Sequence, residues 1–345
     1  MTTLSQIQRA MDRATSYDEW KAAARAHDRK TGMERWKAVD QSRRYDFASI
    51  RVRLDRLRTL RKGGDNRALL FNLHEGIHGN LGGMGNSALY SKAKFGTKQL
   101  ITDYVEEVVS SLEHLADPSA DDIRFEEKLD FFRRADHCFG HSAFMMSGSG
   151  SLFYFHIGVV SALLEQDLLP NVLSGSSGGS FVGSLLSTYP LDQLGELLDP
   201  DNLIDIIERE TGHLRKTSKL KPNVMSIEEI QTIIESLVPD LTFEEARALT
   251  GRDLNISIAP AETHQKSRLL NAITTPNVFI REAVLASAAV PGVYPPVTLA
   301  ARNHLGEKQE YLPSRKWVDG SVSDDMPAKR LARLYGVNHY IVSQT

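Results

Sequence analysis

The residues around Ser177 have the spacing of a nucleophilic serine on a tight turn. The run GSSGG at 175–179 lies between a short apolar run and a helical pattern. A serine in a G-x-S-x-G run between a strand and a helix is typical of a nucleophile elbow, where small neighbours leave room for a strained backbone. The helix that begins there favours developing negative charge. We therefore predict that Ser177 is a nucleophile and that Gly175 and Gly179 are the glycines of its elbow. A glycine-rich turn without chemistry is the alternative.

A second glycine-rich turn, SGSGS at 147–151, lies upstream and again separates an apolar run from a helical pattern. Successive backbone N–H groups at the start of a helix can bind an anion. If the two strands are neighbours, this turn faces Ser177 and forms an oxyanion hole. The residues predicted to form it are Gly148, Ser149, Gly150 and Ser151. A dinucleotide-binding turn is a weaker alternative, because Phe153 stands where its third glycine would be.

The base that activates Ser177 could be a histidine or an aspartate. A triad in the chain order Ser, acid, His requires a histidine after the acid, and only His339 follows the best acid, Asp319. His339 lies in an apolar, strand-like run, so we interpret it as structural. Asp319 precedes Gly320 in a turn that leaves its carboxylate at the end of a sheet. Such an aspartate can accept the serine proton and later activate water, so a Ser177–Asp319 dyad is predicted. Three earlier histidines are also interpreted as structural, namely His141, His156 and His264.

The periodicity of apolar residues differs between two parts of the chain. Residues 1–136 show helical repeats, whereas residues 137–345 alternate short apolar runs with helical patterns. The second pattern predicts an α/β/α sandwich with a mostly parallel central sheet, preceded by a helical N-terminal domain. The predicted strands are 143–147, 171–174, 254–259 and 339–343. The predicted helices are 152–166, 178–188, 226–237, 277–288 and 327–335.

The helical repeats predict two apolar faces in the N-terminal domain. One face consists of Leu100, Ile101, Tyr104, Val105, Val108, Val109 and Leu112. The other consists of Phe47, Ile50, Leu54 and Leu57. The helical repeat that contains this second face also carries a basic cluster. We interpret the cluster as a solvated face, with contact to lipid headgroups as the alternative. Its members are Arg51, Arg53, Arg56, Arg58, Arg61 and Lys62.

The composition is that of an ordinary soluble globular protein. Hydrophobic residues make up 41% of the chain, charged residues make up 25%, and the net charge is −3. Nothing in this balance indicates a nucleic-acid partner, and no metal or cofactor motif is found. The single cysteine, Cys138, excludes an intrachain disulfide and fits a reducing compartment. No secretory signal is recognised, and the apolar stretch 283–301 contains three prolines, which a membrane-spanning helix would rarely tolerate. We therefore expect an intracellular protein whose membrane contact is peripheral.

Four ordered segments of residues 144–345 resemble the patatin-like lipid acyl-hydrolases. These segments are MSGSGSLFYFHIGVV, LSGSSGGS, ASAAVPGVYPPV and WVDGSVSDDMP. The stretch NISIAPAETHQKSRLLNAITTPNVFIREAVLASAAVPGVYPP resembles the subgroup of intracellular triacylglycerol lipases. The N-terminal region is similar to the helical domain that precedes patatin in that subgroup, notably in YDEWKAAARAHD, FNLHEGIHGNLGG and GTKQLITDYVEEV. The family normally continues past the last predicted strand, so by this resemblance the domain that ends at residue 345 is expected to be truncated.

The resemblance implies the same roles for the residues named above: Ser177 as nucleophile, Asp319 as base and residues 148–151 as the oxyanion segment. This chain departs from the family in placing Ser149 in the middle of three expected glycines and Phe153 at a later one. Backbone donation survives a serine if its φ and ψ stay in the allowed region. The implied reaction is hydrolysis of a lipid ester, most directly triacylglycerol, at a membrane or lipid-droplet surface.

Three alternatives to triacylglycerol hydrolysis stay open from the sequence. Phospholipase A or lysophospholipase activity would use the same dyad. Acyl transfer to a lysophospholipid is weaker, because the His-x4-Asp motif typical of acyltransferases is absent from the sequence. A catalytically weak lipid-binding scaffold is the alternative from another class of protein. The oligomeric state is not predicted.

Overall fold

The computed structural model describes residues 2–75, 77, 80–215, 225–262 and 265–345. It divides into two compact units, Met1–Gly140 and His141–Thr345. Gly140 has a φ of +79°, a conformation that favours glycine. Each unit has its own buried core. No helix in the described ranges is long and apolar enough to cross a membrane.

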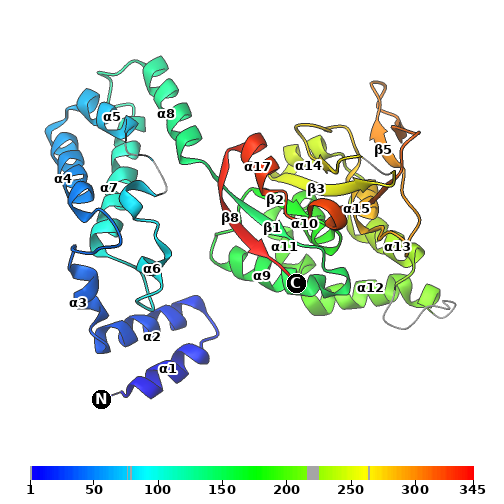
Figure 1. The fold of residues 1–345 in the computed structure, drawn as a ribbon, viewed down its shortest axis with the longest axis horizontal. Helices are drawn as coiled ribbons and strands as arrows, with labels where there is room; N and C mark the ends of the chain where they lie inside the picture. Colours follow the sequence, from blue (N-terminus) through cyan, green and yellow to red (C-terminus); the bar gives the residue numbers. More distant parts are fainter. Residues whose placement is uncertain (1, 76, 78–79, 216–224, 263–264) are drawn as a thin grey trace. The chain divides into compact units, whose positions relative to one another are not determined.

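The first unit consists of helices joined by short links (Figure 1). Its elements are α1 (Leu4–Asp12), α2 (Tyr17–Lys30), α3 (Met33–Ala38), α4 (Phe47–Gly63), α5 (Asn66–His74), the 3₁₀ turn η1 (Leu81–Gly83), α6 (Ser87–Tyr90), α7 (Gln99–Ala116) and α8 (Phe125–Phe139). Several begin at side chains that accept a hydrogen bond from the first turn of the helix, among them Ser16 of α2, Asp46 of α4 and Asp65 of α5. The sequence therefore marks these starts locally.

Helices α4 and α7 pack against each other to form the centre of the first unit. The predicted α4 face is buried at Ile50, Leu54 and Leu57. The predicted α7 face is wrong at Val105 and Val109, whose exposed fractions are 46% and 47%.

The buried face of α7 includes a charged residue that periodicity could not assign to it. Glu107 is 6% exposed, and its carboxylate accepts hydrogen bonds from Arg61 of α4, at 2.7 Å from Nε and 3.0 Å from Nη2. This ion pair turns the polar Glu107 toward α4 and leaves the two valines outward. Of the basic cluster on α4, Arg51 also bonds to an acid, Asp40, at 2.7 Å.

The second unit contains the central sheet. Its strands are β1 (His141–Met146), β2 (Val172–Gly175), β3 (Asp253–Pro260), β4 (Arg268–Leu270), β5 (Leu299–Arg302), β6 (Lys308–Tyr311), β7 (Trp317–Asp319) and β8 (Val337–Ser343). Its helices are the 3₁₀ turn η2 (Gly150–Leu152), α9 (Phe153–Glu165), α10 (Gly178–Thr188), α11 (Leu191–Leu197), α12 (Pro200–Arg215), α13 (Ile227–Leu237), α14 (Phe243–Thr250), α15 (Ile280–Ala288), α16 (Ser321–Asp324) and α17 (Ala328–Tyr335).

The sheet has the order β4-β3-β2-β1-β8, and β7 also pairs with β3. Figure 1 labels four of these strands, β3, β2, β1 and β8. Strands β8, β1, β2 and β3 are parallel, whereas β4 and β7 run antiparallel to β3. The predicted mostly parallel sheet is therefore confirmed. A separate antiparallel pair joins β5 and β6.

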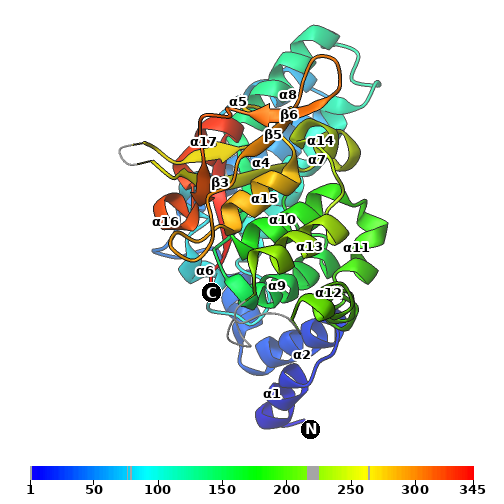
Figure 2. The same cartoon turned by 90° about the vertical axis from the view of Figure 1, so that its right-hand side faces the viewer.

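The side chains of β1 alternate between the two faces of the sheet, and this explains why helices cover both faces to give three layers. Phe144 and Met146 contribute to the core under α10, whereas Ala143 and Met145 contribute to a second cluster with Leu331 of α17. Successive side chains of a strand point to opposite faces of a sheet, so each face is covered by its own helices. On the first face, α10 lies between α9 and α15 (Figure 2). The result is the predicted α/β/α sandwich.

Candidate active site

Ser177 lies on a strained turn between β2 and α10. Its φ is +49° and its ψ is −123°, a conformation that side-chain-bearing residues rarely adopt. Such strain costs about 1–3 kcal/mol and persists only where neighbouring groups hold it. The Ser177 N–H donates to Ser287 Oγ at 2.9 Å, and the Ser287 hydroxyl donates to the carbonyl of Ser257 at 2.8 Å. Ser287, a fully buried residue of α15, thereby ties the turn to β3.

The two predicted elbow glycines lie where no side chain fits. A Cβ on Gly175 would lie 2.3 Å from the carbonyl oxygen of Gly179, and one on Gly179 would lie 2.5 Å from the carbonyl oxygen of Met146. The start of α10 therefore packs directly on the ends of β1 and β2. This close approach brings Ser177 to the edge of the sheet.

The glycine-rich turn after β1 lies beside this elbow. A Cβ on Gly148 would be 3.5 Å from Ser177 Cβ, and a Cβ on Gly178 would be 2.9 Å from the carbonyl oxygen of Gly150. Strands β1 and β2 are neighbours, with Met146 opposite Gly175. The structure thus brings Gly148 and Gly150 next to the nucleophile. Ser151 lies further along, exposed in the turn η2.

The serine in the middle of this turn introduces no backbone strain. Ser149 has a φ of −138°, while the left-handed position belongs to Gly150 with a φ of +51°. The Ser149 hydroxyl packs against Gly178, where an added Cβ would lie 2.3 Å from Ser149 Oγ. The other departure, Phe153, is also accommodated, since its ring stacks on Tyr154 and meets Phe181 edge-on.

Asp319 ends β7 opposite Ile258 of β3 and is 2% exposed. Its backbone N–H donates to the carbonyl of Ala289 at 2.9 Å, and its carboxylate accepts the Ser321 N–H at 2.8 Å. Burial raises the pKa of the Asp319 carboxyl, and hydrogen bonds from the backbone and side chain of Ser321 and from the side chain of Ser177 oppose this. The Ser177 side chain is therefore close enough to Asp319 to lower the pKa of its carboxyl.

Asp325, just beyond α16, makes contacts with both turns of the site. Its Oδ1 accepts the Gly148 N–H at 2.9 Å, and its backbone carbonyl accepts the Ser176 hydroxyl at 3.3 Å. The charge of Asp325 also raises the pKa of Asp319. Sequence reasoning missed both Asp325 and Ser287, although they stand in the segments WVDGSVSDDMP and ASAAVPGVYPPV.

His339 lies at the wrong end of the sheet to complete a triad. It pairs with Ser142 near the start of β1, and its Nδ1 lies 3.0 Å from Ser142 Oγ. Four residues further along β8, Ser343 pairs with Met146, where β1 reaches the site. At about 3.3 Å per residue, the separation along the strand is ~13 Å.

The other predicted structural histidines take different places. His156 is fully buried, with Nδ1 at 2.7 Å from Ser343 Oγ and Nε2 at 3.0 Å from the Ser147 carbonyl oxygen. Burial lowers the pKa of His156, and its contacts support the turn after β1. His141 is exposed at the start of β1, and His264 lies outside the described residues.

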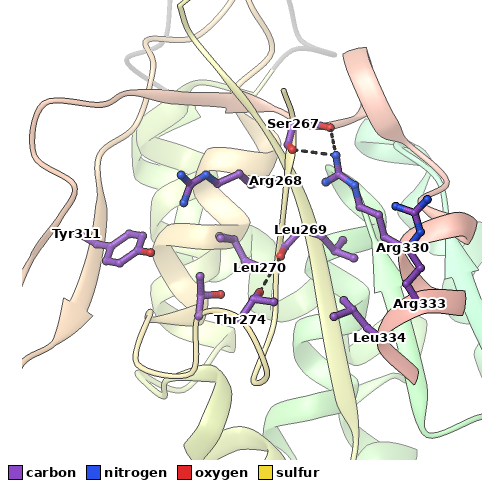
Figure 3. A pocket seen from close by; sticks show the side chains of 10 residues that line it. Ser267, Arg268, Leu269, Leu270, Thr274, Tyr311, Arg330, Arg333 and Leu334 are labelled. Atoms are coloured by element: carbon purple, nitrogen blue, oxygen red, sulfur yellow. Dashed lines mark hydrogen bonds between the residues drawn. The ribbon is translucent and has the colours of Figure 1, made fainter. Parts of the chain in front are cut away.

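A hollow of about 400 Å³ lies away from these residues at the edge strand β4. In Figure 3, Arg268 and Tyr311 lie on one side of β4, while Arg330 and Arg333 lie on the other. Arg330 is already bonded to the Ser267 carbonyl and hydroxyl oxygens at 2.9 and 2.8 Å. These cationic groups do not converge on one point.

A second hollow, of about 370 Å³, is lined by residues that adjoin the site in the chain. Val318 precedes Asp319, Val322 belongs to α16, and Pro291 and Tyr294 belong to the segment after α15. This hollow therefore lies beside Asp319 in the chain and beside the segment that follows α15.

A strained serine at a strand-to-helix turn, beside a buried aspartate and a glycine-rich loop, defines the class of α/β proteins with a nucleophile elbow. The chain belongs to the patatin-like phospholipase family, whose model matches residues 144–332. A second model, described as a domain of unknown function (DUF3336), matches residues 2–137.

Similar proteins occur in fungi and plants. A patatin-like phospholipase domain-containing protein of Cryptococcus neoformans is 35% identical over 99% of this chain and 39% of its own length. Triacylglycerol lipase SDP1L of Arabidopsis thaliana is 32% identical over 97% of this chain and 43% of its own length. Triacylglycerol lipase 5 of Saccharomyces cerevisiae is 33% identical over 99% of this chain and 48% of its own length. The chain thus spans less than half the length of these relatives.

Proposed function

We propose that this protein hydrolyses the carboxylic esters of lipids, with triacylglycerol as the principal substrate, through an acyl-enzyme on Ser177. The observation that carries the proposal is the strained Ser177 beside the buried Asp319, whose carboxyl pKa the Ser177 side chain lowers. Membership of the patatin-like family and the names of the two lipase relatives support the choice of substrate.

The proposed chemistry needs one base and one oxyanion site. Ser177 Oγ attacks the ester carbonyl as its proton passes to Asp319. The resulting oxyanion is stabilised by free backbone N–H groups of the glycine-rich turn after β1 and by the N-terminus of α10. Collapse of the tetrahedral intermediate breaks the bond to the alcohol, which takes the proton from Asp319. Water then attacks the acyl-serine with Asp319 again as base, and the fatty acid leaves.

Work at a lipid surface is part of the proposal. Large apolar side chains are exposed on the segments that flank the site, namely Leu152 and Phe155 beyond the 148–150 turn, Val293 after α15 and Val322 of α16. Each of these four side chains is more than half exposed. Exposed apolar side chains of this kind can enter an interface and bring an insoluble substrate to the enzyme.

A fluorophosphonate probe tests the nucleophile. We expect labelling of the wild-type protein and of Ser161→Ala, a control on α9, but none of Ser177→Ala. Labelling that persists in Ser177→Ala would exclude this serine as the nucleophile.

A comparison of Asp319→Asn with His339→Ala tests the base. Loss of a general base typically costs about 10²–10⁴-fold in rate, so we expect that loss in the aspartate variant alone. A large loss for His339→Ala with a near-normal Asp319→Asn would favour a triad instead.

The substrate is tested by comparing hydrolysis of triolein emulsions, phospholipid vesicles and soluble short-chain esters. We expect the highest turnover on triolein. Preferential release of fatty acid from phospholipid would assign the protein as a phospholipase. Labelling without turnover on any lipid would favour the scaffold alternative.

A further inference from the structure

The N–H of Gly148 is not free to stabilise an oxyanion in this structure. It donates to Asp325 Oδ1 at 2.9 Å. An oxyanion donor acts because it points, without another acceptor, at the place where negative charge develops. Within the hydrogen bonds of the described residues, the N–H groups of Ser149 and Gly150 have no acceptor. The donors of this turn are therefore Ser149 and Gly150, and Gly148 has a different task.

Asp325 joins the three parts of the site. It follows Asp319 by six residues, and the single turn of α16 brings it back over the 148–150 turn. In the same segment, Ser321 packs on Gly148 so closely that an added Cβ would lie 2.9 Å from Ser321 Cβ. The Asp325 carbonyl also accepts the hydroxyl of Ser176, the residue before the nucleophile. One short segment thus connects the base, the elbow and the glycine-rich turn.

We infer that Asp325 is a positioning residue, whose carboxylate holds the Gly148 N–H and thereby orients the amides of Ser149 and Gly150 toward the oxyanion formed on Ser177. The inference rests on the proposed hydrolysis. Glycine at 148 and 150 leaves the turn many alternative conformations, so a fixed acceptor is needed to select one. A hydrogen bond from a backbone N–H to a carboxylate is short and strong enough for this.

The role requires an acceptor at this place but not a negative charge. Asp325→Asn keeps an oxygen that can accept the Gly148 N–H, whereas Asp325→Ala removes it. The matched control is Asp324→Asn, because Asp324 pairs with Arg330 at 3.3 Å rather than with the turn. Steady-state kinetics on a soluble short-chain ester avoid any effect on lipid binding.

We expect Asp325→Ala to lower kcat by about 10–10²-fold, within the range of losing part of an oxyanion hole, with little change in KM. Asp325→Asn and Asp324→Asn should stay within about threefold of the wild type near neutral pH. The affinity for a trifluoromethyl ketone, which forms an oxyanion adduct with the serine, should fall in Asp325→Ala in parallel with kcat/KM. A purely structural role would not couple these two quantities.

Three results would overturn the inference: wild-type kcat in Asp325→Ala, an equal loss in Asp325→Asn and Asp325→Ala, or loss of kcat without weaker ketone binding. If Asp325→Ala does not fold, Asp325→Ser, whose hydroxyl is too short to reach Gly148, gives the same comparison. Failure of the proposed function is a separate outcome, because the wild-type protein would then show neither labelling at Ser177 nor turnover.

Discussion

At the residue scale, the ionisation of Asp319 sets the pH range of activity. A general base must be deprotonated, and burial raises the pKa of this carboxyl above its ordinary value of 3.8. Activity should therefore fall as the pH drops through the raised pKa, earlier than an ordinary aspartate would predict. Because the charge of Asp325 also raises the pKa of Asp319, Asp325→Asn should move this acid limb to lower pH. The pH profile of kcat/KM on a soluble ester measures both effects, and a limb unmoved in Asp325→Asn would contradict the second.

The same raised pKa has a consequence for stability. Between pH 3.8 and the raised pKa of the folded state, Asp319 is more often protonated in the folded protein than in the unfolded chain. The protonated carboxyl favours the folded state, so this contribution to stability is lost as the pH rises. Asp319→Asn removes this cost. We expect the variant to unfold at a higher temperature than the wild type at neutral pH while losing activity, and to show no gain below pH 3.8. Thermal unfolding at the two pH values checks this, and a lower midpoint at neutral pH would show that the carboxylate stabilises the fold.

At the element scale, the junction of β1, β2 and α10 leaves no room for a side chain. Gly179→Ala places a Cβ 2.5 Å from the Met146 carbonyl oxygen and 2.6 Å from that of Ser147. Neither backbone group can move without disturbing the sheet, so we expect a loss of about 3 kcal/mol in the free energy of unfolding together with loss of activity. Denaturant titration measures the change.

The control for this substitution is Gly158→Ala on α9, where an added Cβ meets nothing within 4 Å. An alanine there should stabilise the helix by ~0.5–1 kcal/mol. Equal effects of the two substitutions would contradict a steric role for Gly179.

The Ser287 contact joins the elbow to α15 and β3. Ser287→Ala leaves the Ser177 N–H and the Ser257 carbonyl without this buried partner. We expect a loss of about 1–3 kcal/mol in stability and a lower kcat, because the strained turn of Ser177 is then less firmly held. Ser287→Thr keeps a hydroxyl and should recover part of both. If Ser287→Ala keeps wild-type kcat, the turn does not depend on this bond.

The elements with strong local signals could be predicted from the sequence. The apolar runs of β1, β2, β3 and β8 and the helix after each glycine-rich turn are encoded within about ten residues. Helix α14 was missed although Thr242 and Glu245 form a capping box at its start, which is a usable signal. Strands β4 and β7 have three residues each, too few for periodicity to reveal their antiparallel pairing with β3.

Part of the candidate site could likewise be predicted from the sequence, and part could not. The turn at Ser177 is local, since a strand, small residues and a helix follow one another there. The bonds from Ser177 to Ser287 and from Gly148 to Asp325 span 110 and 177 residues. No spacing in a single sequence encodes contacts over such distances, so the supporting residues emerge only from the fold.

At the scale of the whole molecule, the two units contain buried carboxylates of opposite pH dependence. In the first unit Asp28 is fully buried and accepts the Lys37 ammonium at 2.9 Å and the N–H groups of Lys94 and Phe95 at 2.9 and 3.0 Å. Burial alone would raise the pKa of Asp28, but these bonds outweigh it and lower the pKa below 3.8. Burial alone would likewise raise the pKa of Glu107, but the hydrogen bonds and the charge of Arg61 help to lower this pKa below 4.5.

The stability from these two carboxylates is fully present above the ordinary carboxyl pKa and is lost as the pH falls through their lowered values. Asp319 in the second unit has the opposite dependence. We therefore expect acid to unfold the helical unit before the unit that contains the sheet. Asp28→Asn, which removes the charge from a buried ion pair, should destabilise the helical unit by about 3 kcal/mol at neutral pH and flatten its acid transition.

Tryptophan fluorescence can report on each unit separately, because Trp20 and Trp36 lie in the first unit and Trp317 lies in the second. Trp317→Phe leaves only Trp20 and Trp36. The indole nitrogen of Trp317 has no hydrogen-bond partner among the described residues, so this substitution breaks no hydrogen bond of that nitrogen. The double variant Trp20→Phe, Trp36→Phe leaves only Trp317. On acidification, Trp317→Phe, which reports the helical unit, should show its transition at a higher pH than the double variant, which reports the unit with the sheet. Coincident transitions would mean that the two units unfold as one, whereas the reverse order would show that the buried carboxylates of the helical unit do not control its stability.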